Sequence, residues 1–157
     1  MEEPSAAEVC EIAVNLDDVS PEVVGHAVDA LLEAGALDVW TTPITMKKQR
    51  PGVCLSLLCK PEDRDRLARK VIELTGSFGV RYRRWDRLVL ARRFDKVQTA
   101  LGPVRLKFGM LDGRIITAKP EYDDAAALAE QNGVPVRYVL DEARALAQAL
   151  LMGEAEA

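Results

Sequence analysis

The amino-acid sequence predicts an α+β fold, in which a ferredoxin-like βαββαβ sandwich is followed by a small β-hairpin/strand plus two-helix C-terminal subdomain. Two observations lead to this prediction. Strand and helix patterns follow one another in the order βαββαβ over residues 9–93. Only a turn separates the second and third strands, so there is no room for the crossover helix of a doubly wound sheet. We expect a flexible leader over residues 1–8, the sandwich over 9–93, the subdomain over 94–152 and a frayed tail over 153–157.

Alternation and helix-capping residues define the first two elements. Apolar side chains occupy every second position of the predicted strand Val9–Leu16, which gives this strand one buried face. Ser20 is a favourable N-cap, and Pro21 suits the first position of a helix. The helix that begins there runs to about Ala34, and Gly35 ends it.

The next elements complete the sandwich. Strands Leu37–Met46 and Val53–Lys60 are joined by a basic turn, and the second of these strands is apolar on both faces. We therefore expect it to be central and covered. A helix extends from Pro61 to Thr75, and the alternating stretch Val80–Arg92 predicts a long fourth strand.

The remaining residues predict the small subdomain. Strands Lys96–Ala100 and Val104–Phe108 form a hairpin, and strand Arg114–Ala118 follows it after a tight turn. Pro120 and Pro135 each open a helix, because proline is favoured at the first helical position.

Composition argues against several classes of protein. The net charge of −4 disfavours a broad nucleic-acid-binding surface, which needs a net basic face. No apolar run approaches the roughly 20 residues that span a bilayer, and the acidic first residues are not a signal peptide. We expect a cytoplasmic protein with no nucleic-acid or membrane partner.

The sequence offers few ligands for a transition metal. Cys10, Cys54 and Cys59 lie in apolar runs, so we expect reduced and buried thiols. Cys54 and Cys59 are five positions apart, an odd spacing that places them on opposite faces of one strand, where they cannot share a metal. His26 is the only histidine and is expected to be structural.

Polar residues that are far apart in the sequence converge in the predicted topology. One edge of a ferredoxin-like sheet collects the end of the first strand, the turn between the second and third strands, and the start of the fourth. The N-terminus of the first helix lies there too, and its unpaired N–H groups favour anions. The polar residues at this edge are Asp17 and Asp18, then Lys47, Lys48 and Arg50, and then Ser77, Arg81 and Arg83.

This set suits a metal-bound polyphosphate. Asp17 and Asp18 supply the carboxylate oxygens that Mg²⁺ or Mn²⁺ prefers, while the cations neutralise phosphate oxygens. Arg81, Arg83 and Trp85 share one strand parity and offer surfaces on which a ring can stack. Simpler explanations exist for each part: a helix lead-in for the aspartates, a solvated loop for the basic turn and a subunit interface for the arginines.

A second and weaker cluster follows the last predicted strand. Lys119 ends this strand, and acidic residues open the next helix. In a functional interpretation Lys119 binds an anion, with Glu121 or Tyr122 positioning the substrate. In the simpler interpretation the acids only compensate the helix dipole.

Several stretches of the chain resemble one known family. They are NLDDVSPE, AGALDVWTTPITMKKQRPG, LLCKPEDRDRL, GVRYRR, GPVRLK and KPEYDD, within roughly residues 9–148. Together they are similar to the C-terminal domain of LarC, the nickel-pincer cofactor biosynthesis protein family (pyridinium-3,5-bisthiocarboxylic acid mononucleotide nickel insertion protein). The MKKxRPG turn combined with KPEY is the specific part of the resemblance.

The resemblance implies a CTP-dependent cyclometallase of the lyase class. The family inserts Ni²⁺ into pyridinium-3,5-bisthiocarboxylic acid mononucleotide, which gives the cofactor of lactate racemase, and splits CTP to CMP and pyrophosphate with Mn²⁺ or Mg²⁺. For this chain it implies a CTP-binding domain over residues 9–93 and a homo-oligomer, trimer or hexamer. It also implies that an N-terminal domain of the same protein is a partner, so the isolated chain is expected to be inactive.

The predicted edge and the resemblance together give the residue assignments. Phosphate binding is assigned to Lys47, Lys48, Arg50, Ser77, Arg81, Arg83 and Lys119, and the metal of metal-CTP to Asp17 and Asp18. No residue is assigned to nickel or to catalysis. Relatives typically have TTTLGVR where this chain has TGSFGVR, which weakens any phosphate contact of that loop. Two alternatives stay open: a non-catalytic trimeric nucleotide-binding regulatory module, and a scaffold whose basic strand is an oligomer interface.

Overall fold

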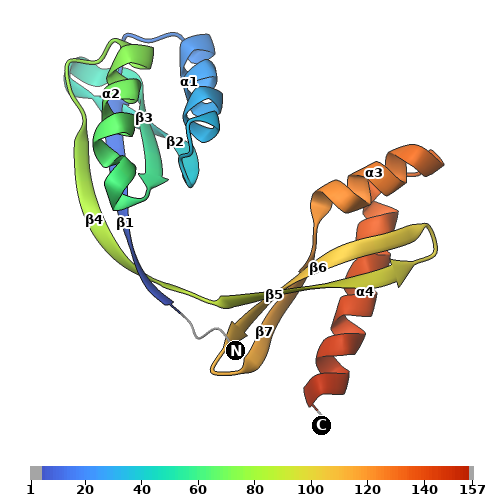
Figure 1. Ribbon diagram of the computed structural model, residues 1–157. Helices are drawn as coiled ribbons and strands as arrows, with labels where there is room; N and C mark the ends of the chain where they lie inside the picture. Colours follow the sequence, from blue (N-terminus) through green and yellow to red (C-terminus); the bar gives the residue numbers. More distant parts are fainter. Residues whose placement is uncertain (1–4, 156–157) are drawn as a thin grey trace. The chain divides into compact units, whose positions relative to one another are not determined.

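The computed structural model describes residues 5–155, which form two compact units (Figure 1). The amino-terminal unit spans residues 6–87, and the carboxy-terminal unit consists mainly of the residues from Leu88 onward. Each unit has its own hydrophobic core. No helix in the described part of the chain is long and apolar enough to cross a membrane.

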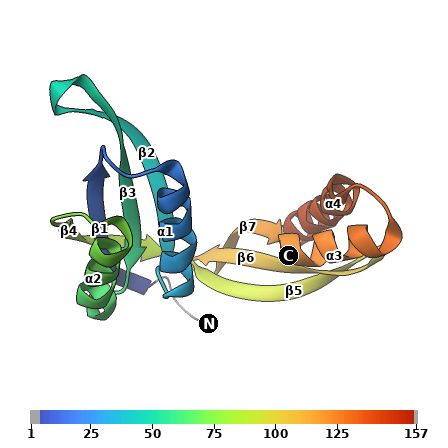
Figure 2. The ribbon, with the colours of Figure 1, turned by 90° about the horizontal axis from the view of Figure 1, so that it is seen from above.

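The amino-terminal unit is a four-stranded sheet with two α-helices on one face (Figure 2). The strand order is β2-β3-β1-β4, and β3 is antiparallel to both of its neighbours. This arrangement is ferredoxin-like and confirms the predicted fold class. The elements are β1 (Ser5–Leu16), α1 (Pro21–Glu33), β2 (Asp38–Met46), the 3₁₀ turn η1 (Lys47–Gln49), β3 (Arg50–Cys59), η2 (Pro61–Asp63), α2 (Arg64–Thr75) and β4 (Arg81–Val89).

The core of this unit lies between the sheet and the helices. Alternate side chains of β1 and β3 pack against α1 and α2, and Ile12, Leu31, Leu57 and Leu67 are at most 1% exposed. Burial of an aliphatic side chain of this size stabilises the folded state by about 1.5–3 kcal/mol. Ser20 stands at the N-cap of α1 as predicted, but its hydroxyl makes no hydrogen bond to the helix backbone.

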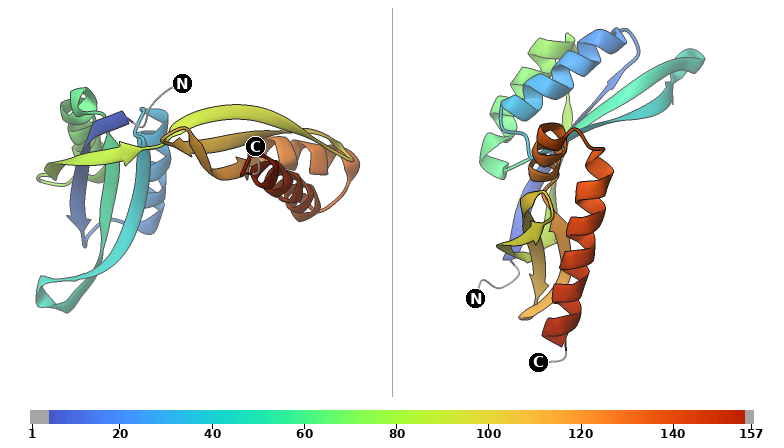
Figure 3. Two further views of the ribbon diagram at one scale, coloured as in Figure 1. Left: turned by 90° about the horizontal axis from the view of Figure 1, so that it is seen from below. Right: turned by 90° about the vertical axis from the view of Figure 1, so that its right-hand side faces the viewer.

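The hairpin of β2 and β3 extends beyond the rest of its sheet (Figures 2 and 3). The last residue of β1 in the ladder is Leu16, which pairs with Val53. The β2–β3 ladder continues for three further pairs, ending with Met46 opposite Arg50. We call residues 44–52 the β2–β3 arm, and its tip is the turn η1.

The bounds of two predicted strands are wrong. The predicted long strand Val80–Arg92 is two strands, β4, which ends at Val89, and β5, which begins at Ala91. The strand that was predicted to start at Lys96 is the later part of β5. Both strands have the side-chain alternation of a β-strand, and no glycine or proline marks the break at Leu90. The pattern therefore gave no sign that the chain leaves one sheet for another.

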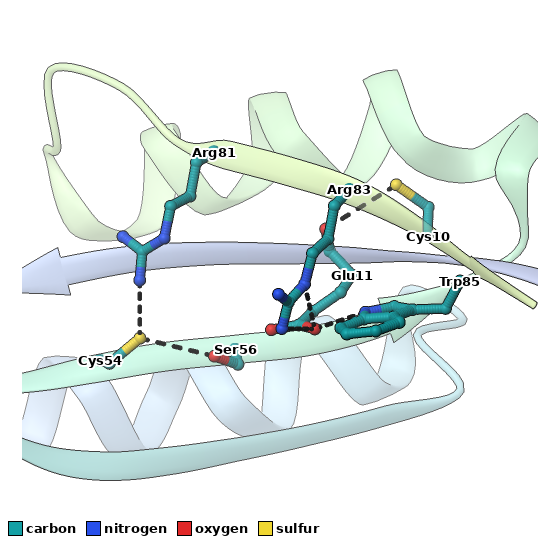
Figure 4. Close-up of polar contacts among 7 residues, drawn as sticks. All are labelled: Cys10, Glu11, Cys54, Ser56, Arg81, Arg83 and Trp85. Atoms are coloured by element: carbon teal, nitrogen blue, oxygen red, sulfur yellow. Dashed lines mark hydrogen bonds and ion pairs between the residues drawn. The ribbon is translucent and has the colours of Figure 1, made fainter.

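Strand β3 is central as predicted, and side chains rather than a helix cover its second face. Both α-helices of the unit pack on one side of the sheet, and the opposite side is occupied by side chains of neighbouring strands (Figure 4). The apolar residues on both faces of β3 therefore predicted its central place correctly.

The chain ends also differ from expectation. Strand β1 begins at Ser5, within the predicted leader, of which residues 1–4 lie outside the described residues. Helix α4 continues to Ala155, into the stretch predicted to fray, and residues 156 and 157 lie outside the described residues.

The carboxy-terminal unit is a three-stranded antiparallel sheet of order β5-β6-β7 with two helices packed on it (Figure 3). Its buried residues include Val104, Leu106, Phe108, Val139 and Ala143. The elements are β5 (Ala91–Thr99), β6 (Gly102–Leu111), β7 (Arg114–Pro120), α3 (Tyr122–Asn132) and α4 (Val136–Ala155).

An ion pair fixes the start of α3 on β6. The guanidinium of Arg105 donates from Nε and Nη2 to the two carboxylate oxygens of Asp124, at 2.8 and 2.7 Å. The backbone N–H of Arg105 also donates to Asp124, at 2.9 Å. These bonds, chiefly those from the Arg105 side chain, lower the pKa of Asp124 to about 2.

We predict that Asp124→Asn lowers the free energy of unfolding by about 1–2 kcal/mol at pH 7, because it leaves charge-assisted hydrogen bonds unmade. The folded-state pKa is depressed, so the stabilisation is complete above the ordinary aspartate value of about 4 and is lost as the pH falls toward about 2. Urea unfolding at pH 7 and pH 3 should show the difference from wild type shrinking. Asp123→Asn, on the exposed neighbour, is the control, and a difference independent of pH would contradict the prediction.

Gly52 fixes the base of the β2–β3 arm. A Cβ atom at this position would lie 2.7 Å from the carbonyl oxygen of Leu16 and 3.0 Å from Sδ of Met46. We predict that Gly52→Ala lowers the free energy of unfolding by about 1–3 kcal/mol, because backbone must move. Gly25→Ala is the control, since nothing lies within 4 Å of a Cβ there; in a helix this change should stabilise by about 0.5–1 kcal/mol. Equal melting temperatures for the two variants would contradict this.

Candidate functional site

The structure brings the end of β1 and the base of the β2–β3 arm together. Arg50 Nη1 lies 3.3 Å from Oδ2 of Asp17, whose side chain is 17% exposed. Beside this ion pair is a pocket of about 210 Å³ that also adjoins the start of α1. The pocket is lined by Leu16, Asp17, Val19, Val24, Pro51, Gly52 and Val53.

The other charged residues predicted at this edge are exposed. Lys47 and Lys48 form the tip of the arm, and Asp18 follows Asp17 before α1. No hydrogen bond or ion pair to any of these three side chains occurs within residues 5–155. Their charges are therefore available to a ligand or to another molecule.

The two aspartates fit a metal ion that brings its own ligands. Within the described residues, no group of three or more His, Cys, Asp or Glu side chains is placed to hold a metal. One carboxylate with a guanidinium partner and one free carboxylate can complete the shell of Mg²⁺ or Mn²⁺ when phosphates and water supply the other oxygens. The same chemistry does not make a nickel site of thiolate and imidazole ligands.

Ser77 lies in the loop between α2 and β4, and its hydroxyl is engaged locally. It donates to the carbonyl of Gly79 at 2.9 Å and accepts from the N–H of Gly79 at 3.3 Å. The backbone N–H of Ser77 donates to Thr75 Oγ1. This hydroxyl must give up a loop hydrogen bond before it can donate to a phosphate.

Arg83 belongs to a cluster of side chains on the open face of the sheet, the face without helices (Figure 4). Its Nε and Nη2 donate to Oε2 of Glu11 at 3.1 and 3.0 Å, and the indole N–H of Trp85 donates to the same oxygen at 2.7 Å. The Arg83 guanidinium also stacks on the Trp85 ring, 3.9 Å from its centroid. The charge of Arg83 is thus paired with the Glu11 carboxylate, and its guanidinium covers the Trp85 ring.

Glu11 is the residue that the sequence argument missed. Its position on the polar face of β1 was apparent, and in a ferredoxin-like sheet β1 lies beside β4, as it does here. Matching the parity of Glu11 with that of Arg83 and Trp85 could have identified the pairing. Trp85 is 41% exposed rather than part of a core.

Arg81 contacts a thiol on the same open face. Its Nη2 donates to Sγ of Cys54 at 3.3 Å, and this sulfur lies 3.5 Å from Oγ of Ser56 (Figure 4). Cys54 is therefore half-buried and polar in its contacts, which corrects the expectation that all three thiols are buried. A cavity of about 310 Å³ adjoins Arg81, Arg83 and Glu11.

Lys119 belongs to the carboxy-terminal unit. It is exposed on β7 and lies opposite Lys107 of β6, whose Nζ is 3.0 Å from Oε1 of Glu121. Of the predicted phosphate-binding residues, it is the one that the structure places outside the amino-terminal unit.

The three cysteines should differ in reactivity. Burial raises the pKa of Cys59 to about 11 and also raises the pKa of Cys10, so both thiols stay protonated and shielded at neutral pH. We predict that iodoacetamide at pH 8 alkylates Cys54 first and reaches Cys10 and Cys59 only after unfolding. Peptide mass spectrometry of folded and urea-treated protein measures this, with Cys54→Ser as the control. Equal labelling of all three in the folded state would contradict it.

The nickel insertion protein family model matches residues 1–140. Curated relatives named for nickel insertion include one from Maridesulfovibrio salexigens, 45% identical over 80% of this chain and 30% of the relative. Another, from Thermomicrobium roseum, is 42% identical over 92% of this chain and 36% of the relative. The chain therefore spans about a third of the length of these relatives.

Two solved structures extend the comparison. Protein MK0293 of Methanopyrus kandleri is 29% identical, with a TM-score of 0.66 over 92% of this chain and 90% of that one. The apo form of LarC2, the C-terminal domain of a cyclometallase in the synthesis of the NPN cofactor of lactate racemase, is 39% identical. It superimposes with a TM-score of 0.86 over 92% of this chain and 99% of that one, which confirms the resemblance to LarC. The chain belongs to the nickel insertion protein family.

Proposed function

We propose that this chain is the metal-CTP-binding C-terminal part of a cyclometallase that inserts nickel into pyridinium-3,5-bisthiocarboxylic acid mononucleotide. The observation that carries the proposal is the edge where the Asp17–Arg50 ion pair, the start of α1 and the basic arm adjoin one pocket. The family membership and the likeness to LarC2 support the nickel-pincer assignment. The product would serve lactate racemase.

The residues at the edge have separate roles in this proposal. Asp17 and Asp18 would hold Mn²⁺ or Mg²⁺, which when bound supplies positive charge to the phosphate oxygens of CTP. The first N–H groups of α1 would donate to a phosphate, because they have no partner within the helix. Lys47, Lys48 and Arg50 would neutralise the remaining negative charge.

Nickel is a substrate in this proposal rather than a resident cofactor. The described residues offer no cluster of soft ligands, so the sulfur atoms of the pyridinium substrate would supply its ligands. The N-terminal domain of the longer protein would complete the catalytic site, and the chain would act as a homo-oligomer.

A regulatory nucleotide-binding module is the second candidate. It is favoured by the exposure of the edge and by the lack of a metal-ligand cluster within residues 5–155. Incubating the full-length protein with CTP, Ni²⁺ and the pyridinium substrate distinguishes the two, because only the cyclometallase converts CTP to CMP. Intact CTP after formation of a protein–CTP complex would support the regulatory module.

We predict that Lys48→Ala weakens CTP binding in the presence of Mn²⁺ roughly tenfold, equivalent to about 1.4 kcal/mol, because a cation that faces phosphate is lost. Isothermal titration calorimetry measures the affinity. Lys60→Ala, which removes an exposed lysine beyond the opposite end of β3, is the matched control and should bind like wild type.

Asp17→Asn should reduce the difference in CTP affinity between solutions with and without Mn²⁺, because the metal loses a carboxylate. Melting temperature is the control for folding. Equal affinity of the wild type with and without Mn²⁺ would overturn the metal role.

A further inference from the structure

We propose that the sheet of the carboxy-terminal unit binds the pyridinium substrate on the face turned away from its helices. In this proposal the substrate ring stacks on Phe94, and its negatively charged groups face Lys107 and Lys119. The inference rests on the proposed function, which supplies a pyridinium ring with thiocarboxylate and phosphate groups as the substrate. It adds a site for that substrate and assigns Lys119 to it instead of to CTP.

The strand register places an aromatic ring and two lysines in one row. Phe94 of β5 pairs with Lys107 of β6, and Lys107 pairs with Lys119 of β7. Residues opposite one another on neighbouring strands share a face, with Cβ atoms about 4.5–5.5 Å apart. Leu106 and Phe108, on either side of Lys107 in the chain, pack in the core with α3 and α4. The row therefore lies on the face away from these helices, which we call the outer face (Figure 3).

The outer face has an excess of positive charge, although the whole chain has a net charge of −4. Only two carboxylates reach its cations: Glu121 lies 3.0 Å from Lys107, and Asp124 holds Arg105. The cations that share the parity of this face are Arg92, Lys96, Arg105, Lys107 and Lys119.

Part of this charge has no partner. The side chains of Arg92 and Lys119 make no hydrogen bond or ion pair with any other residue of the stretch 5–155. Lys107 and Lys119 are also direct cross-strand neighbours, and like charges in such a pair destabilise a sheet. A negatively charged ligand between the strands would relieve this repulsion.

Phe94 offers an aromatic surface that no other side chain covers. Its side chain is 59% exposed. Other exposed aromatic rings carry a guanidinium, since Arg83 lies 3.9 Å from the centroid of Trp85 and Arg64 lies 4.6 Å from that of Tyr82. Within the described residues no cation lies over Phe94. Its face is therefore free to stack on a ligand.

The chemistry of the outer face is the inverse of that of a pyridinium carboxylate. Such a ligand has a positively charged ring with negative groups at its periphery. A positive ring is attracted to the face of Phe94, while lysines attract carboxylate-type groups and phosphate. Neighbouring strands are about 4.8 Å apart, so the row from Phe94 to Lys119 spans about 10 Å, which suits a single substituted ring. Cytosine has no negative group on its ring, so the same face favours the pyridinium compound over CTP.

Titration calorimetry with pyridinium-3,5-dicarboxylate mononucleotide, the oxygen analogue of the substrate, tests the proposal. Lys107→Ala/Lys119→Ala should weaken binding of this probe about tenfold, because two cations that face its negative groups are lost. Phe94→Ala should weaken it about threefold through loss of stacking. Arg114→Ala, which removes an exposed cation at the other end of β7, is the matched control and should bind like wild type. CTP affinity in the presence of Mn²⁺ and the melting temperature should be unchanged in all three.

Two competitors identify the groups that the face recognises. Pyridine-3,5-dicarboxylate should displace the probe at lower concentration than inorganic phosphate does, because it retains the ring. Equal displacement by the two would assign the face to phosphate alone and overturn the inference. Displacement by a short single-stranded RNA in preference to both would overturn it in favour of a nucleic acid.

The inference and the proposed function fail separately. A wild-type chain that binds CTP but not the probe, or outer-face variants that bind the probe as tightly as wild type, would overturn the inference alone. Loss of CTP affinity in the lysine double variant with probe binding intact would also overturn it, by assigning the face to CTP. A wild-type chain that binds the probe but not CTP would overturn the CTP-binding role and leave the outer face as a substrate site.

Discussion

Strand β3 pairs with β2 on one side and β1 on the other, and this double ladder determines where Asp17, Arg50 and the β2–β3 arm lie. Its register sets Arg50 beside Asp17 and extends the arm past the end of β1. The same register exposes one face of Cys54 and Ser56 to the side chains of β4. The edge therefore depends on the two ladders of β3, and the open face depends also on the place of β4 beside β1.

The Asp17–Arg50 ion pair contributes more to position than to stability. The arginine is half exposed and the pair is 3.3 Å apart, so its contribution is about 0–1 kcal/mol. Its effect is to orient a carboxylate at the mouth of the pocket while Gly52 fixes the backbone beneath it. The metal ion proposed for this carboxylate would therefore compete only with a weak partner.

The sequence predicted the order of elements because alternation, capping residues and turns are local properties. It failed at Leu90, where two alternating strands follow one another without a turn residue between them. It placed Asp17 near Arg50, since topology alone brings those segments together. It could not assign partners to Arg81 and Arg83, because strand parity gives the face of a side chain but not the atoms that it meets.

Those partners change the distribution of charge in the candidate site. Of the five cations that the sequence placed at this edge, Arg83 is held by Glu11 and Trp85, Arg81 contacts a thiol, and Arg50 faces Asp17. The arginines are thus engaged by neighbouring strands, and within residues 5–155 Lys47 and Lys48 are the cations of this set whose side chains have no partner. These two lie at the end of the arm, and they are not among the residues that line the pocket beside Asp17.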